Sequence, residues 1–152
     1  MKILAVDVGD ARTGLAACDR TEFLASPIGV IHDRTLEGTV EKTAIAVTEY
    51  DIGLVVVGYP LNMNGSRGPK AEQCAQFAEA LRAHVEVPVI LWDERSTTVS
   101  AHQVLTENGV HGKKRKNTVD GVAAAFILEG FLAWRKNHPG EMPPEDPGKE
   151  DA

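Results

Sequence analysis

The sequence has few of the residues on which disulfide-linked domains and soft-metal sites depend. Its 152 residues include only two cysteines, Cys18 and Cys74, which lie far apart and match no metal-ligand spacing. The five histidines show neither the spacing of a catalytic triad nor that of a metal site. A disulfide framework and a cysteine-based zinc site are therefore not expected, and we interpret both cysteines as spare thiols in a reducing cytoplasm.

Long apolar runs are also lacking. No hydrophobic stretch approaches the roughly 20 residues that cross a bilayer, and the sequence begins with a strand-like segment rather than with a signal peptide. We therefore expect a cytoplasmic protein with no membrane partner. Hydrophobic residues make up 43% and charged residues 25% of the sequence, which is typical of a globular domain with one full core.

The net charge of −6 is distributed unevenly. Residues 137–152 contain five acids, one lysine, four prolines, two glycines and no aromatic residue. This composition predicts a disordered acidic tail after a single domain of residues 1–136. Within that domain the basic residues cluster as KKRK at 113–116, so a local basic patch, rather than a basic whole, is expected to bind nucleic acid. The tail could compete with nucleic acid for this basic run.

The hydrophobic pattern predicts an α/β domain. It favours strands at residues 2–8, 15–18, 25–32, 53–58 and 87–92, and helices at residues 35–50, 69–84, 97–107 and 118–135. Hairpin-linked strands followed by strand–helix units predict a sandwich built on a mixed five-stranded sheet. In open α/β sheets the working site lies at the carboxyl ends of the strands.

Carboxylates gather at this predicted edge. Asp7 closes the first strand, Asp93 and Glu94 follow the last strand, and Asp120 stands in the expected first turn of the last helix. Such acids repel one another unless a cation binds among them, and Mg²⁺ and Mn²⁺ prefer oxygen ligands. Two ions about 3.5–4 Å apart can activate a water and stabilise the leaving oxygen in phosphodiester hydrolysis. The pattern therefore favours a metal-dependent nuclease site.

Two of these acids, Asp7 and Asp120, also have an ordinary structural explanation. Asp7 could be a buried carboxylate paired with Arg12 or Arg95. Asp120, preceded by the possible N-cap Thr118, could compensate the positive end of the helix dipole. Both explanations weaken because acids from three distant segments share one edge.

Turns and basic residues surround these acids. Gly9 and Gly14 let a phosphate approach the backbone closely, or they serve only a hairpin turn. The segment GYPLNMNGS offers polar contacts to sugar or phosphate, or it is an ordinary strand-to-helix loop. Basic side chains bind phosphates without reading sequence, and salt weakens these contacts. The candidate nucleic-acid-binding residues are Arg12, Asn62, Arg95, Lys113, Lys114, Arg115 and Lys116.

Four motifs together resemble the YqgF/RuvX-type family. They are DVGDARTG, GYPLNMNG, DERSTT and KKRKNTVD, in that order over residues 7–120. The family is known for Holliday-junction resolvases and pre-16S rRNA nucleases with an RNase H-like fold. The resemblance implies a three-layer sandwich with helices on both faces of the sheet. It also implies a nuclease that matures the 5′ end of pre-16S rRNA in ribosome biogenesis or, alternatively, cleaves branched DNA.

The resemblance implies that Asp7, Glu94 and Asp120 are catalytic and bind Mn²⁺ or Mg²⁺, with two ions expected. Asp93 could act in place of Glu94 or beside it. Adjacent strand residues point to opposite faces, so only one of the two should face the metal, and we favour Glu94. The chain departs from the family pattern at Ser96, where leucine is common, and at Gly121, where serine is common. Neither departure removes an acid.

Two other classes of protein are alternatives to a nuclease. Actin-like and sugar-kinase ATPases carry a similar acid-and-glycine loop, but they need a second copy of the fold, and this sequence contains no repeat. A non-catalytic nucleic-acid-binding protein with the same fold is the other alternative. A homodimer would suit a symmetric junction, although no interface motif supports it. The sequence leaves open the natural substrate, the endo- or exonucleolytic mode and the preferred ion.

Overall fold

A mixed five-stranded sheet forms the centre of the fold. The computed structural model describes residues 1–94 and 112–147, without the side chains of residues 112–120. The sheet has the order β3-β2-β1-β4-β5, and its antiparallel β1–β2–β3 meander is followed by β4, which pairs in parallel with β1 and β5. The strands are β1 (Ile3–Asp7), β2 (Arg12–Cys18), β3 (Ala25–His32), β4 (Leu54–Tyr59) and β5 (Val89–Asp93). The predicted mixed sheet is confirmed.

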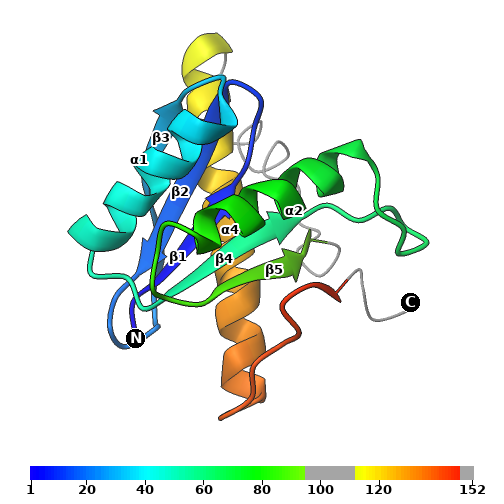
Figure 1. The fold of residues 1–152 in the computed structure, drawn as a ribbon. Helices are drawn as coiled ribbons and strands as arrows, with labels where there is room; N and C mark the ends of the chain where they lie inside the picture. Colours follow the sequence, from blue (N-terminus) through cyan, green and yellow to red (C-terminus); the bar gives the residue numbers. More distant parts are fainter. Residues whose placement is uncertain (95–111, 148–152) are drawn as a thin grey trace.

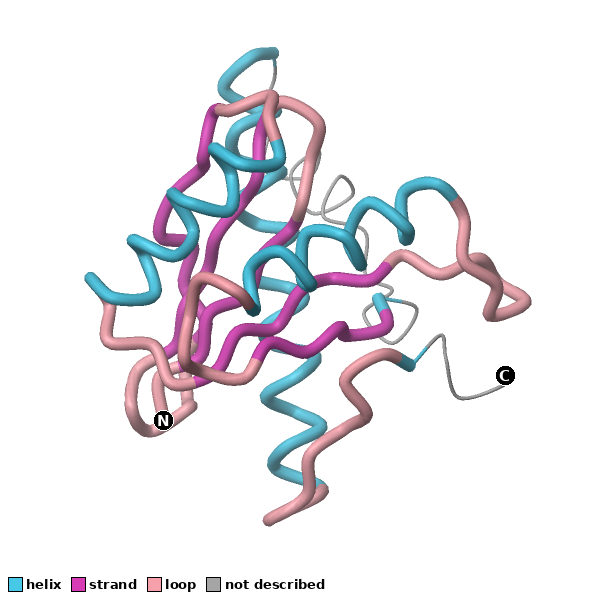
Figure 2. The backbone as a smooth tube through the Cα atoms, in the orientation of Figure 1, coloured by secondary structure: helices cyan, strands magenta, loops and turns pink. Residues whose placement is uncertain are grey.

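Helices cover both faces of this sheet. They are α1 (Leu36–Glu49), α2 (Pro69–Arg82) and α4 (Gly112–Asn137). Figure 1 shows α1 and α2 over one face and α4 over the other, and Figure 2 shows the same three layers by secondary structure. The Thr35 side chain caps α1 by accepting a hydrogen bond from the Gly38 N–H at 3.0 Å, and a proline opens α2. The predicted helix at residues 97–107 lies outside the described residues.

The last helix begins earlier than predicted. The helix was predicted to begin near Thr118, whereas α4 begins at Gly112. Asp120 therefore lies more than two turns inside the helix, where the helix dipole has little effect, so the expectation that it compensates the dipole is wrong. The physical reason is that lysine and arginine form helices well. The basic run extends the helix instead of preceding it.

Alternate residues of each strand belong to two different hydrophobic cores. Leu4 and Val6 of β1 pack in the core under α1 and α2, whereas Ile3 and Ala5 pack in the core under α4. This two-residue period follows from the pleat of the strand. Both faces of the central strands are therefore apolar, as the continuous hydrophobic runs of the sequence predict. The α4 core is closed by aromatic contacts, including an edge-to-face pair of Trp92 and Phe131 with centroids 5.4 Å apart.

Part of the predicted tail contacts the domain. The N–H of Leu91 in β5 donates to the Glu145 carbonyl at 2.8 Å, and the Asp146 carboxylate forms an ion pair with Arg67 at 2.6 Å. The boundary between a domain of residues 1–136 and a tail of residues 137–152 stays a prediction. Residues 148–152 lie outside the described part of the chain.

The structure also describes both cysteines and the apolar character of the helices. Cys18 and Cys74 are both buried and free, as expected for thiols that pack as small apolar groups. None of the helices in the described part of the chain is both long enough and apolar enough to cross a membrane.

Candidate active site

Asp7 stands at the carboxyl edge of the sheet, on the face that α4 covers. It is the last residue of β1 and is half-buried. Ile3 and Ala5 lie in the core under α4, and the strand alternation continues through Asp7. The structure therefore places this carboxylate between the edge of the sheet and the α4 layer.

Glu94 reaches the same face from β5. Ile90 and Trp92 pack under α4, so alternation puts Glu94 on that side and Asp93 on the other. Position 58 on the neighbouring strand bears this out. A Cβ built on Gly58 would stand 3.1 Å from Cδ of Glu94 and 2.6 Å from Cδ1 of Ile127 in α4. Only a glycine leaves room for both side chains.

The carboxylates of Asp7 and Glu94 interact electrostatically. Burial, and next the negative charge of Asp7, raise the pKa of Glu94 from 4.5 to about 7, and Asp93 adds a smaller effect in the same direction. Burial chiefly, with smaller effects of Glu94 and Asp7, raises the pKa of the buried Cys74 thiol to about 12. Cys74 therefore stays protonated at neutral pH and is no candidate nucleophile.

Lys70 also belongs to this electrostatic cluster, although it was not among the predicted site residues. It is an exposed residue in the first turn of α2, and its ammonium group lowers the pKa of Glu94 against the larger effects of burial and Asp7. The Gly68–Pro69 dipeptide marks the start of a helix that follows a strand. That signal could have placed Lys70 at the same edge as the acids.

The donor set fits a hard divalent cation. Asp7 and Glu94 offer carboxylate oxygens, which Mg²⁺ and Mn²⁺ prefer, and a cation would relieve the repulsion that raises the pKa of Glu94. Among the side chains that the structure describes, no three histidine, cysteine, aspartate or glutamate residues form a group that could hold a metal. The third predicted ligand, Asp120, lies in α4, and its side chain is outside the description.

The turn after Asp7 is shaped by its glycine. A Cβ built on Gly9 would stand 2.0 Å from the carbonyl oxygen of Arg12, and the Gly9 N–H donates to the Thr13 hydroxyl at 3.3 Å. The tight β1–β2 turn alone therefore requires glycine at this position. Arg12 opens β2 and is half-buried, which puts its backbone at the same edge as Asp7.

Among the other predicted nucleic-acid-binding residues, the structure describes the side chain of Asn62 only. Asn62 is exposed in the loop between β4 and α2, and its side chain donates to the Ser66 hydroxyl at 2.9 Å. A backbone hydrogen bond from Asn62 to Ser66, also 2.9 Å long, closes the loop. Arg95 lies outside the described residues. The basic residues 113–116 lie at the start of α4, and their side chains are not described.

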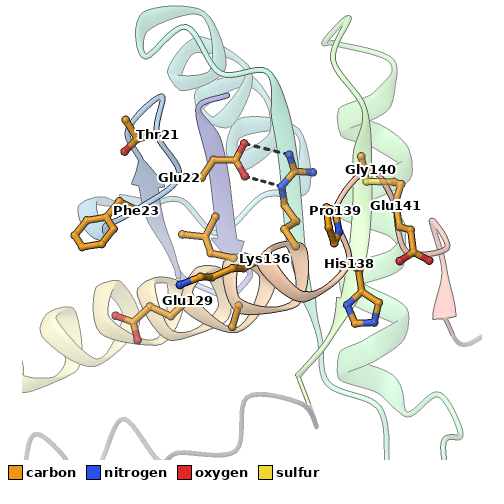
Figure 3. A pocket seen from close by; sticks show the side chains of 13 residues that line it. Thr21, Glu22, Phe23, Glu129, Lys136, His138, Pro139, Gly140 and Glu141 are labelled. Carbon is orange, nitrogen blue, oxygen red and sulfur yellow. Dashed lines mark hydrogen bonds and ion pairs between the residues drawn. The ribbon is translucent and has the colours of Figure 1, made fainter.

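A cavity of about 720 Å³ lies at the other end of the sheet (Figure 3). Its lining includes Phe23 from the β2–β3 turn, Met142 from the C-terminal segment and Arg135 from α4. Arg135 and Glu22 form an ion pair of 2.7 Å across its wall. None of the predicted site residues lines this cavity, so the site rests on the carboxyl edge of the sheet.

A family model and curated relatives match almost the whole chain. The model described as "RuvX: Holliday junction resolvase" matches residues 1–134. A protein of Clostridium novyi named "Putative pre-16S rRNA nuclease" is 37% identical over 87% of this chain and 98% of its own. Proteins of the same name from Halothermothrix orenii and Bacillus cereus are each 40% identical. Their matches cover 89% and 87% of this chain, and 96% and 98% of their own.

Solved structures share the fold at low sequence identity. RuvC of T. thermophilus in complex with a Holliday junction has a TM-score of 0.54 at 12% identity, over 88% of this chain and 96% of its own. The Holliday junction resolvase of fowlpox virus has a TM-score of 0.51 at 16% identity, over 90% of this chain and 99% of its own. These likenesses show an RNase H-like fold. The family match and the curated relatives show that this chain belongs to the RuvX/YqgF family of nucleases.

Proposed function

We propose that this chain is a divalent-metal-dependent nuclease that hydrolyses phosphodiester bonds during 5′-end maturation of pre-16S rRNA. The observation that carries the proposal is the placement of the Asp7 and Glu94 carboxylates on one face of the sheet edge, where their negative charges interact. Relatives at 37–40% identity over most of the chain bear the name of pre-16S rRNA nuclease. This activity implies that the protein acts in the cytoplasm, where ribosomes are assembled.

In this proposal Asp7, Glu94 and Asp120 bind Mn²⁺ or Mg²⁺, with two ions expected. When bound, the ions supply an activated water and stabilise charge on the leaving oxygen. Glu94 reaches this face of the sheet because position 58 is a glycine, whose missing side chain leaves room beside the carboxylate. The ammonium of Lys70 favours the ionised form of Glu94, which is the form that binds cations. Asp93 is assigned no primary role because alternation puts it on the other face.

Substrate binding is assigned to the backbone phosphates. Arg12 and Asn62 lie at the edge where Asp7 stands, and the basic run at 113–116 opens the helix that contains Asp120. With Arg95, these residues form the proposed contacts to phosphate. Such contacts position the nucleic acid without reading its sequence, and they weaken as salt rises.

Branched DNA is the second candidate substrate. It is favoured by the matching family model, whose description is that of a Holliday junction resolvase. The same acids would hydrolyse a DNA phosphodiester by the same chemistry. A homodimer would present two such sites to a two-fold symmetric junction, and it stays a prediction.

The test is cleavage of end-labelled pre-16S leader RNA and four-way-junction DNA with Mn²⁺, with Mg²⁺ and with chelator. Asp7→Asn should lose cleavage by about 100-fold or more while it still binds nucleic acid. Asp10→Asn is the matched control, because Asp10 is exposed in the adjacent turn and accepts a hydrogen bond from Gln73 at 3.1 Å. Cleavage by Asp7→Asn at the wild-type rate would refute the site. Binding without cleavage by the wild type would identify a non-catalytic binder.

A further inference from the structure

Arg67 joins three segments of the chain. It lies in the loop between β4 and α2, and its Nε donates to the hydroxyl of Tyr59 at 2.5 Å. The guanidinium also lies over the Tyr59 ring, 5.7 Å from its centroid, and Nη1 contacts Glu72 of α2 at 3.1 Å. These two partners fix the guanidinium from within its own strand–loop–helix unit.

The third partner comes from the acidic C-terminal segment. Nη2 of Arg67 donates to the Asp146 carboxylate at 2.6 Å, across 79 positions of sequence. The Asp146 side chain is only 14% exposed and that of Arg67 26%, so water screens this pair less than it screens a surface ion pair. The Leu91–Glu145 hydrogen bond holds the segment against β5, and Figure 1 shows the red C-terminal segment beside that strand.

The position of Arg67 points to a substrate phosphate. Tyr59, which holds its guanidinium, ends β4 at the carboxyl edge of the sheet, and its side chain packs in the core under α1 and α2, on the other face from Glu94. Arg67 therefore lies at the same sheet edge as the proposed catalytic acids, on the side that α2 covers. A guanidinium binds carboxylates and phosphates with the same planar geometry. Asp146 consequently presents to Arg67 the same kind of anionic oxygen that a nucleic-acid backbone would present.

We propose that Arg67 binds a backbone phosphate of the nucleic-acid substrate, and that Asp146 occupies Arg67 in the free protein. The acidic segment then competes with the substrate, and binding requires that Asp146 be displaced. This inference rests on the proposed function. It also assigns the competition to Arg67, whereas the sequence suggested the basic run at 113–116.

The test is a double-mutant cycle on binding to a fluorescein-labelled single-stranded RNA, followed by anisotropy at low salt in chelator, where cleavage is off. Asp146→Asn should tighten binding about fivefold, and Arg67→Gln should weaken it and reduce the salt slope by about one. Asp146→Asn should have no effect in the Arg67→Gln background. Glu141→Gln is the matched control, because this substitution removes one negative charge from the same C-terminal segment, at the cavity at the other end of the sheet.

Four outcomes would overturn the inference. Equal effects of Asp146→Asn and Glu141→Gln would indicate a general charge effect, and so would an Asp146→Asn effect that persists without Arg67. An Arg67→Gln variant that loses thermal stability but keeps its salt slope would assign Arg67 a structural role only. If the wild type cleaves RNA but the effects of Asp146→Asn and Arg67→Gln on binding are independent, this inference fails and the proposed function stands. If no variant binds RNA or a four-way DNA junction, it fails together with the proposed function.

Discussion

The Glu94 carboxylate occupies space that any side chain at Gly58 would take. Gly58 stands between the strands that carry the two candidate catalytic acids, because Val57 pairs with Val6 of β1 and Gly58 pairs with Trp92 of β5. The missing side chain thus creates the space in which Glu94 lies beside α4. The shape of the candidate site depends on a residue that has no chemistry of its own.

Gly58→Ala should therefore damage both stability and activity. The added methyl would press on Ile127 and Glu94, and overpacking of this kind costs about 1–3 kcal/mol of unfolding free energy. We expect at least about a tenfold loss of cleavage, because a displaced carboxylate misplaces its ligand oxygens. Urea unfolding and initial cleavage rates measure the two effects. Gly29→Ala is the control, since a Cβ there meets nothing within 4 Å. Equal stability of the two variants would contradict the expectation.

The stability of the metal-free protein should fall as pH rises from about 5 to 8. The pKa of Glu94 is about 7 in the folded protein against an ordinary 4.5, so in this window the folded state holds a proton that the unfolded state has lost. The favourable contribution is complete below pH 4.5 and is lost as pH rises through 7, up to about 3 kcal/mol. Urea unfolding in chelator should show this slope in the wild type and a flatter one in Glu94→Gln. Parallel slopes in both proteins would refute the assignment.

Divalent cations should stabilise the wild type. An ion that binds only the folded state at about 100 times its Kd adds about 2.7 kcal/mol, which raises the melting temperature by several degrees. We expect this rise with Mn²⁺ at pH 7.5 in the wild type and in Asp10→Asn, and its loss in Asp7→Asn and Glu94→Gln. Differential scanning fluorimetry measures it. An equal rise in all four proteins would place the ion elsewhere.

Removing the charge of Lys70 should raise the pKa of Glu94 above about 7, since the ammonium now lowers it. Carbon-13 NMR titration of the glutamate carboxyl groups in Lys70→Gln measures the change directly. Lys136→Gln removes the same charge beside the cavity at the other end of the sheet and should leave the titration of Glu94 unchanged. A Glu94 titration that is the same in both variants would remove Lys70 from the cluster.

The sheet could be predicted from the sequence because its strands are short, apolar and bounded by glycine or polar residues. Strand β3 was predicted with its observed ends, and β4 within one residue. The helix predicted at residues 69–84 is observed as α2, and apolar residues at helical spacing along it, including Cys74 and Phe77, are buried. These features follow from local periodicity, which the sequence carries directly.

Other features depend on contacts between distant segments. The start of α4 was misplaced because a charged run was interpreted as a loop when its residues also favour a helix. The contact between Arg67 and Asp146 joins two segments whose composition suggests only a turn and a tail. No local pattern reports such a pairing.

The hydrogen bond from Leu91 to the C-terminal segment has a consequence for how copies of this chain meet one another. β5 is an outer strand of the sheet, and unpaired N–H and C=O groups along such a strand can recruit a strand from another molecule. The segment that carries Glu145 takes up one of these donors. Cutting it away would free the N–H of Leu91 in the middle of the apolar Val89–Asp93 strand. The acidic segment thus covers a point on the sheet edge at which a strand from another copy would otherwise find a hydrogen-bond donor.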